Sequence, residues 1–264
     1  MRPERTGTSE LASAAGPGSS VSSDTSTDAV RTTGDDATSD AHDGRAILFV
    51  GNSYTAGNDL AGLVEALASA DGAAPVAVEV IAVAGETMAG HLSTPSTLDA
   101  ITTGDWDLVV LQGQSVEPME PGSDFHSAAT SLADVVVDAG AAVVLFETWA
   151  RADGDALYQQ PWYGPDPAAA QAKLRAAYQA VADSSGGRVA PVGDAWERAW
   201  TEAPELPLYA GDGSHATIHG SYLAACVLLE ALTERRAVDN PFWPDALTAN
   251  EAATLQALAD AATP

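Results

Sequence analysis

The sequence predicts an α/β fold built on a five-stranded parallel sheet that helices cover on both faces. From residue 45 onward, short apolar runs alternate with longer segments in which apolar residues recur at helical spacing. The connections between successive apolar runs are long enough for the crossovers that parallel strands require. Apolar residues make up 46% of the chain, which is enough for a full core.

Each element follows from this alternation. The expected strands are 46–51, 76–83, 107–112, 142–148 and 188–192. The expected helices are about 58–71, 96–103, 125–139, 166–184, 193–201 and 217–233. The last segment, 247–262, has the spacing of an amphipathic helix that packs on the outside of the sheet's helical layers. We therefore expect residues 45–264 to form one domain.

Residues 1–44 have a different composition, because Ser, Thr, Asp, Gly and Ala dominate and large apolar side chains are almost absent. Such a segment cannot bury enough surface to fold, so we expect a disordered low-complexity tail. Arg2 and Arg5 give it a basic start, but the apolar segment of a signal peptide does not follow. A location outside the cytoplasm would need an export signal from a start upstream, so the compartment stays open.

Charge and cysteine content exclude several functions. The chain has 37 acidic and 11 basic residues, and its formal net charge is −26. This surface repels nucleic acids and anionic membranes, and no apolar stretch is long enough for a transmembrane segment. Cys226 is the only cysteine, so an internal disulfide or a Cys-based metal cluster cannot form. It lies in an apolar helical run, where we expect it to be buried and inert.

The most informative stretch is the turn Gly51-Asn52-Ser53, between an apolar run and a helical pattern. Ser53 is therefore expected at the carboxyl end of the first strand, where open α/β sheets bind ligands. A serine in this place can be a nucleophile whose backbone N–H helps to bind an oxyanion. It can also do no more than cap the following helix.

A second group lies near the other end of the chain, in Asp212-Gly213-Ser214-His215. The two intervening residues allow the Asp212 carboxylate to meet the His215 ring, as the base of a serine hydrolase requires. The order Ser, Asp, His along the chain fits an α/β hydrolase layout. Asp-x-x-His alone is a weak signal, but together with Ser53 it predicts a catalytic triad.

These blocks, with Leu111-Gln112-Gly113-Gln114-Ser115, resemble the SGNH (GDSL-like) hydrolase superfamily, most closely a bacterial branch of it. The resemblance covers roughly residues 45–235 and marks 45–264 as an SGNH-hydrolase-like catalytic domain. It implies a flavodoxin-like three-layer α/β/α sandwich and ester hydrolysis through an acyl-serine, without metal or cofactor. By this resemblance Ser53 is the nucleophile, His215 the general base and Asp212 its orienting partner.

The same resemblance implies an oxyanion hole with three donors. They are the backbone N–H of Ser53, the backbone N–H of a glycine matched by Gly85, and an amide side chain after the third strand. Glutamines stand where the superfamily has asparagine. Gln114 matches by register and is placed first, while Gln112 lies directly at the strand end and stays open. A glutamine amide can donate the same hydrogen bond over one more methylene.

Aromatic residues gather after the fourth strand, on the sheet edge expected for Ser53. Trp149 is followed by a long loop, 150–165, that carries Tyr158, Trp162 and Tyr163. Loops of this length are often functional. The four side chains could stack on a sugar ring as a substrate-binding surface, or they could be a local packing cluster, and both interpretations stay open.

Three functions compete. The first is a serine esterase that removes small, acetyl-type acyl groups from a small molecule or a glycan. The second is a flavodoxin-like FMN carrier, in which Ser53, Tyr54 and Thr55 would bind the phosphate and the Asp-x-x-His group would have no role. The third is a degenerate SGNH domain that binds glycans without cleaving them. Ser115 is a rival nucleophile because it also follows a strand, but no helix signal comes directly after it.

Overall fold

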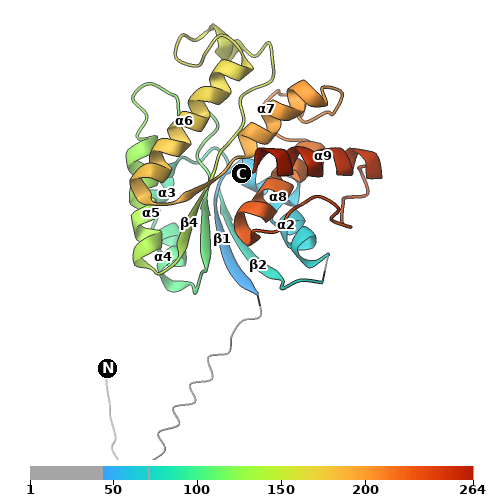
Figure 1. Cartoon of the computed structure of the whole chain (residues 1–264). Coiled ribbons are helices and arrows are strands. Elements are labelled where there is room, and N and C mark those ends of the chain that lie inside the picture. The colour runs from blue at the N-terminus through green and yellow to red at the C-terminus, as the bar shows by residue number, and fades with distance from the viewer. Residues whose placement is uncertain (1–43, 71, 264) are drawn as a thin grey trace, which may run out of the picture. The chain divides into compact units, whose positions relative to one another are not determined.

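The computed structural model describes residues 44–70 and 72–263. Within this part, five parallel strands form one sheet in the order β2-β1-β3-β4-β5 (Figure 1). The strands are β1 (Arg45–Gly51), β2 (Val76–Ala82), β3 (Leu108–Leu111), β4 (Ala142–Phe146) and β5 (Arg188–Ala190). The predicted fold class is confirmed. The predicted tail, residues 1–44, lies outside the described residues apart from Gly44.

Helices cover both faces of the sheet (Figure 1). One face packs against α2 (Leu60–Ser69), α7 (Val192–Glu202), α8 (Ile218–Thr233) and α9 (Ala249–Ala262). The other packs against α3 (Met88–Ser93), α4 (Pro95–Thr103), α5 (Phe125–Asp138) and α6 (Pro167–Ser185). Among these, the short helix α3 is the one that the sequence analysis does not predict. The expected helix over 247–262 is α9.

The central strand β1 shows why an uninterrupted apolar run predicts a buried strand. Ile47 and Phe49 pack into the core under α2 and α8, while Leu48 and Val50 pack into the core under α5. Successive side chains of a strand point to opposite faces, so a strand covered on both sides needs apolar residues at every position. Cys226 is fully buried in α8, as expected, and burial raises the pKa of its thiol.

The helix expected over 58–71 begins later, at Leu60. Asn58 and Asp59 have φ angles of 52° and 54°, in the left-handed region. Asparagine and aspartate tolerate this conformation better than most residues. The two residues lie within the 3-10 turn η1 (Gly57–Asp59), which separates α2 from the single turn α1 (Ser53–Ala56). The kink matters for the site, because it points the Asn58 side chain toward the loop that carries His215.

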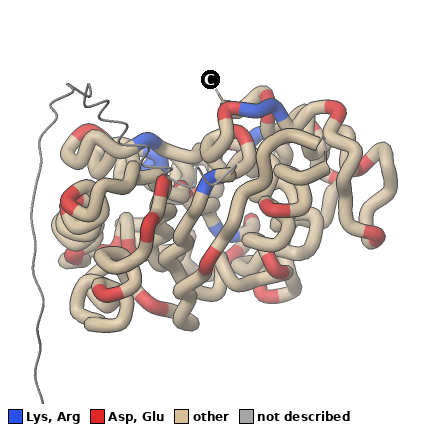
Figure 2. Tube along the Cα trace, turned by 90° about the horizontal axis from the view of Figure 1, so that it is seen from below, with Lys and Arg blue, Asp and Glu red and all other residues tan. Residues whose placement is uncertain are grey.

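Acidic residues are spread along the described trace and outnumber Lys and Arg, as the composition requires (Figure 2). Several described arginines form ion pairs with carboxylates, for example Arg175 with Asp194 and Glu197. Over residues 44–70 and 72–263, no helix has both the length and the apolar character needed to cross a membrane.

Candidate active site

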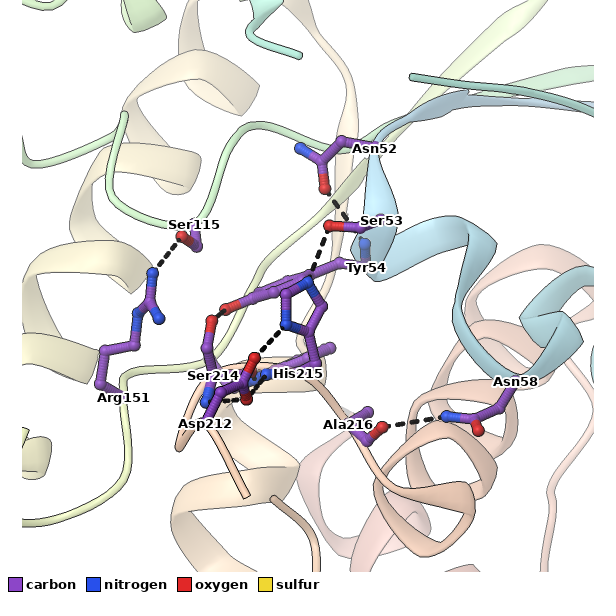
Figure 3. Close-up of polar contacts among 11 residues, drawn as sticks. Asn52, Ser53, Tyr54, Asn58, Ser115, Arg151, Asp212, Ser214, His215 and Ala216 are labelled. Atoms are coloured by element: carbon purple, nitrogen blue, oxygen red, sulfur yellow. Dashed lines mark hydrogen bonds and ion pairs between the residues drawn. The ribbon is translucent and has the colours of Figure 1, made fainter. Parts of the chain in front are cut away.

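Ser53 is the first residue of α1, and a single residue, Asn52, separates it from the end of β1. The residue that caps this turn is Asn52, whose Oδ1 accepts a hydrogen bond from the backbone N–H of Tyr54 at 3.1 Å. The capping interpretation of Ser53 is therefore wrong. Its hydroxyl oxygen instead lies 2.9 Å from Nε2 of His215, which is 162 residues away in the sequence (Figure 3).

The hydrogen-bonded chain continues from His215 to Asp212. Nδ1 of His215 lies 2.5 Å from Oδ2 of Asp212, and the backbone N–H groups of Ser214 and His215 each donate to Oδ1 at 3.0 Å (Figure 3). The His215 hydrogen bond is the main cause that holds the pKa of Asp212 well below its ordinary value, and the two backbone bonds act in the same direction. The carboxylate therefore stays ionised, and it fixes the ring with Nδ1 as the donor.

Bonds from distant parts of the chain hold the loop that carries this pair. The hydroxyl of Tyr54 lies 2.7 Å from the hydroxyl of Ser214, and the indole N–H of Trp149 donates to the Ser214 carbonyl at 2.9 Å. The Asn58 amide donates to the Ala216 carbonyl at 3.0 Å (Figure 3). Because Tyr54 and Asn58 both follow Ser53 closely in the chain, the serine and the histidine loop are held to each other directly.

A cavity of about 380 Å³ lies beside this chain of residues. Its walls come from the loops after β1, β2, β3 and β4 and from the histidine loop, at the carboxyl edge of the sheet. The lining residues are Asn52, Ser53, Tyr54, Ala84, Gly85, Gln114, Ser115, Arg151, Asp212, Ser214 and His215. The cavity is thus the place where a small substrate would meet the Ser53 hydroxyl.

The groups that could bind an oxyanion face this cavity. Among the described residues, the backbone N–H groups of Ser53 and Gly85 form no hydrogen bond. Gly85 has a φ angle of 72°, which a side chain would strain, and this explains the glycine. Oε1 of Gln114 accepts hydrogen bonds from the N–H groups of Val116 and Glu117 at 2.8 and 3.2 Å. The amide orientation is thereby set, and the Gln114 NH₂ group remains available.

The structure corrects the expectation that Gln112 could be a donor of the oxyanion hole, because its side chain does not line the cavity. The side chain is fully buried, and Oε1 accepts from the backbone N–H of Asn52 at 3.0 Å and from the hydroxyl of Thr55 at 2.8 Å. Nε2 donates to the carbonyl of Gly113. Gln112 directly follows β3, which pairs with β1, and its side chain therefore reaches and supports the turn that carries Ser53.

The two glutamines should therefore respond differently to truncation. We expect Gln114→Ala to lower kcat for an acetyl ester by about 10²–10³-fold, the usual cost of one oxyanion donor. Gln112→Ala should instead lower the free energy of unfolding by about 1–3 kcal/mol, because it leaves buried polar groups without a partner. Steady-state kinetics and urea unfolding of both variants measure this contrast. A Gln114→Ala enzyme with wild-type kcat would contradict the assignment.

The aromatic residues after β4 do not line the cavity, which corrects their expected role in substrate binding. Trp149 is 1% exposed and stacks between Tyr54 and Trp196, with ring centroids 4.4 and 4.1 Å apart. Tyr163 is fully buried, and Tyr158 and Trp162 pack against its ring. The packing interpretation holds, because Trp149 and Tyr163 are buried against α7 and α6. Tyr158 and Trp162 are partly exposed but lie outside the cavity that Ser53 lines.

The sequence analysis missed three side chains that shape the site. Arg151 lines the cavity, and its Nη2 donates to the hydroxyl of Ser115 at 3.0 Å (Figure 3). Nε2 of His91 donates to the carbonyl of Gly51 at 2.8 Å, directly beneath the serine turn. Glu117, 5% exposed, accepts from the N–H groups of Gln114 and Met88, so it joins the loops after β3 and β2. For Arg151 a signal existed: it is one of 11 basic residues and closely follows a strand.

Comparison with known proteins shows the family and the fold. A protein of Slackia heliotrinireducens assigned to the SGNH hydrolases is 30% identical, with a TM-score of 0.62, over 72% of this chain and 99% of that one. A DUF4886 family protein from Bacteroides uniformis is 18% identical, with a TM-score of 0.66, over 83% and 94% of the two chains. A variant of an acetyl-xylooligosaccharide esterase from Geobacillus Stearmophilus is 14% identical, with a TM-score of 0.54, over 72% and 94%. The last two show the shared fold.

The chain therefore belongs to the SGNH hydrolase superfamily, and its enzyme class is that of the carboxylic ester hydrolases. No protein-family model matches the chain, and no curated protein matches it. In the described part of the chain, no group of three or more His, Cys, Asp or Glu residues could hold a metal ion.

Proposed function

We propose that the protein hydrolyses small, acetyl-type esters through an acyl-serine intermediate on Ser53. The observation that carries the proposal is the hydrogen-bonded chain from Ser53 through His215 to Asp212, with distances of 2.9 and 2.5 Å, at the wall of a cavity. These contacts fit the roles of nucleophile, general base and orienting acid. A cavity of about 380 Å³ favours a short acyl group.

The first half of the reaction forms the acyl-enzyme. Oγ of Ser53 attacks the carbonyl carbon of the ester while Nε2 of His215 takes the hydroxyl proton. The Asp212 carboxylate stabilises the resulting imidazolium through Nδ1–H. The oxyanion of the tetrahedral intermediate accepts hydrogen bonds from the N–H groups of Ser53 and Gly85 and from the Gln114 amide. The intermediate then expels the alcohol, which takes the proton from His215.

The second half releases the acid. A water molecule gives a proton to Nε2 of His215 and attacks the acyl carbon, and a second tetrahedral intermediate forms in the same oxyanion hole. This intermediate breaks its bond to Oγ of Ser53, which recovers the proton from His215. The products are one carboxylic acid and one alcohol for each ester and water consumed, and the enzyme returns to its starting state.

The alternatives have less support. For an FMN site, the hydroxyl of Thr55 is fully buried and donates to Gln112, and the hydroxyl of Tyr54 is bonded to Ser214, so neither is available to a phosphate. For a glycan-binding domain without turnover, the aligned pair of His215 and Asp212 would have no use. One observation supports a carbohydrate as the alcohol portion of the ester: a protein of the same fold is an acetyl-xylooligosaccharide esterase.

Ser115 is a poor rival to Ser53. It is 6% exposed, and its hydroxyl accepts a hydrogen bond from Arg151. A guanidinium is always protonated and cannot take the serine proton, so it cannot act as the general base.

A fluorophosphonate probe followed by peptide mass mapping tests the proposal, because such probes react with activated serines. We expect one adduct, on Ser53. Ser53→Ala should lose the label, and Ser115→Ala, the matched control, should keep it. An adduct on Ser115 would place the nucleophile after β3 instead. Folded wild-type protein that stays unlabelled would favour glycan binding without turnover.

A further inference from the structure

We propose that the ester substrate carries a carboxylate and that Arg151 binds it beside Ser53. This inference rests on the proposed function and names the substrate class of the same site. Arg151 lies five residues beyond the end of β4, and its side chain extends toward Ser115 in the wall of the cavity that Ser53 and His215 also line (Figure 3).

The guanidinium of Arg151 lacks the partner that arginines usually have in this protein. Arg175, Arg188, Arg198 and Arg236 each form an ion pair with Asp or Glu. Arg151 forms none with any residue that the structure describes, although the chain has 37 acidic residues. An unpaired cation in the wall of a cavity is what an anionic ligand requires.

The hydrogen bonds of the guanidinium are also incomplete. An arginine has five N–H donors. Within the described residues, the Arg151 guanidinium forms one hydrogen bond, from Nη2 to the Ser115 hydroxyl at 3.0 Å. Its buried Nε has no partner there. A carboxylate can accept two hydrogen bonds from one guanidinium in a shared plane. It would accept from the N–H groups of Nη1 and Nη2, for which the Ser115 hydroxyl is the one acceptor among the described residues.

The backbone of Arg151 is held firmly, which suits a residue that orients a substrate. The hydroxyl of Tyr163 accepts from its N–H at 2.9 Å, and the hydroxyl of Tyr158 donates to its carbonyl at 2.5 Å. The preceding residue, Ala150, donates to Gln171 at 2.9 Å and accepts from Tyr209 at 2.7 Å. The aromatic loop thus acts as a support for Arg151. Preorganised binding groups lose less entropy when the ligand arrives.

Charge favours a carboxylate over a phosphate dianion. The net charge of −26 repels anions in general, so an anionic substrate needs a local cation. Arg151 offers a single positive charge, and Asp212 in the same cavity wall is a carboxylate with a lowered pKa. One guanidinium neutralises a monoanion, whereas a dianion would leave excess negative charge close to Asp212.

Matched ester pairs test the proposal and locate the carboxylate. On the acyl side, p-nitrophenyl acetate is compared with the p-nitrophenyl hemiester of succinate. On the alcohol side, O-acetyl glucose is compared with O-acetyl glucuronate. In one pair we expect wild-type kcat/KM to be about 10–100-fold higher for the anionic ester, the usual worth of a charge-assisted hydrogen bond. Arg151→Gln should bring that ratio close to 1, and Arg151→Lys should keep part of it.

Arg188→Gln is the matched control. Arg188 lies at the amino end of β5, the edge of the sheet opposite Ser53, and pairs with the exposed Glu234. This variant should keep the wild-type ratio. Circular dichroism and thermal unfolding verify that each variant is folded. If Arg151→Gln does not fold, wild-type enzyme tests the proposal directly: succinamate, which carries one carboxylate, should inhibit hydrolysis of p-nitrophenyl acetate more strongly than the neutral succinamide does, and salt should weaken this inhibition.

The outcomes separate this inference from the proposed function. If wild-type enzyme hydrolyses both members of each pair equally well, the carboxylate proposal is overturned and the esterase stands. The same holds if Arg151→Gln lowers kcat/KM for the anionic and the neutral ester by the same factor, because Arg151 would then be a structural residue. If no ester is hydrolysed and the fluorophosphonate probe leaves Ser53 unlabelled, the proposed function fails and this inference fails with it.

Discussion

Ser53→Ala and His215→Ala are each expected to lower kcat for p-nitrophenyl acetate by about 10⁴–10⁶-fold. Alanine at position 53 removes the atom that would form the acyl-enzyme. Alanine at position 215 removes the acceptor of its proton, which lies 2.9 Å from the serine hydroxyl. Because both residues act in one step, the double variant should be no slower than either single variant. Initial rates with burst titration of wild-type active sites measure the effect.

The control for this prediction is Ser115→Ala, which removes a neighbouring hydroxyl in the same cavity but leaves the proposed triad intact. Neither alanine substitution in the triad should change the fold, because Ser53 and the His215 ring are both partly exposed. Thermal unfolding verifies this. Wild-type turnover in either Ser53→Ala or His215→Ala, with the variant folded, would refute the acyl-serine mechanism.

Asp212→Asn should lower kcat by about 10³–10⁴-fold while leaving the loop in place. An asparagine oxygen can still accept from the N–H groups of Ser214 and His215, as Oδ1 does in the wild type. Its NH₂ group would then face Nδ1 of His215, where a donor is the wrong partner. The ring would turn its proton toward Ser53 and could no longer take the serine proton. The measurement is kcat against pH for the variant and the wild type.

The pH dependence of stability offers a second measurement on the same variant. The pKa of Asp212 lies well below its ordinary value of 3.8, chiefly because of the His215 hydrogen bond. A lowered carboxylate pKa contributes stability that is present above the ordinary value and is lost as the pH falls through the folded-state value. Wild-type stability should therefore fall more steeply below about pH 4 than that of Asp212→Asn. Equal slopes would mean that the Asp212–His215 bond does not couple to folding.

The sequence by itself determined the fold class, and it singled out Ser53, Asp212 and His215 as the candidate triad. Strand β1 is readable because it is covered on both faces and is therefore apolar at every position, while α8 is readable from its apolar helical run. Both signals are local. The meeting of Ser53 with His215 was also predictable, because loops that follow parallel strands gather at one edge of a sheet. The helical spacing over 58–71 hid the left-handed kink at Asn58, since periodicity carries no information on a single φ angle.

The tertiary structure alone decided which polar and aromatic side chains face the cavity. Gln112 and Gln114 are chemically the same, and they separate because one turns beneath the loop after β1 while the other points its amide oxygen at its own turn. Tyr163 and Trp149 lie in a segment without periodicity, so only their contacts with α6 and α7 determine that they are buried. Arg151 stands out only once its neighbours are known. These features depend on residues far apart in the chain, which no local pattern encodes.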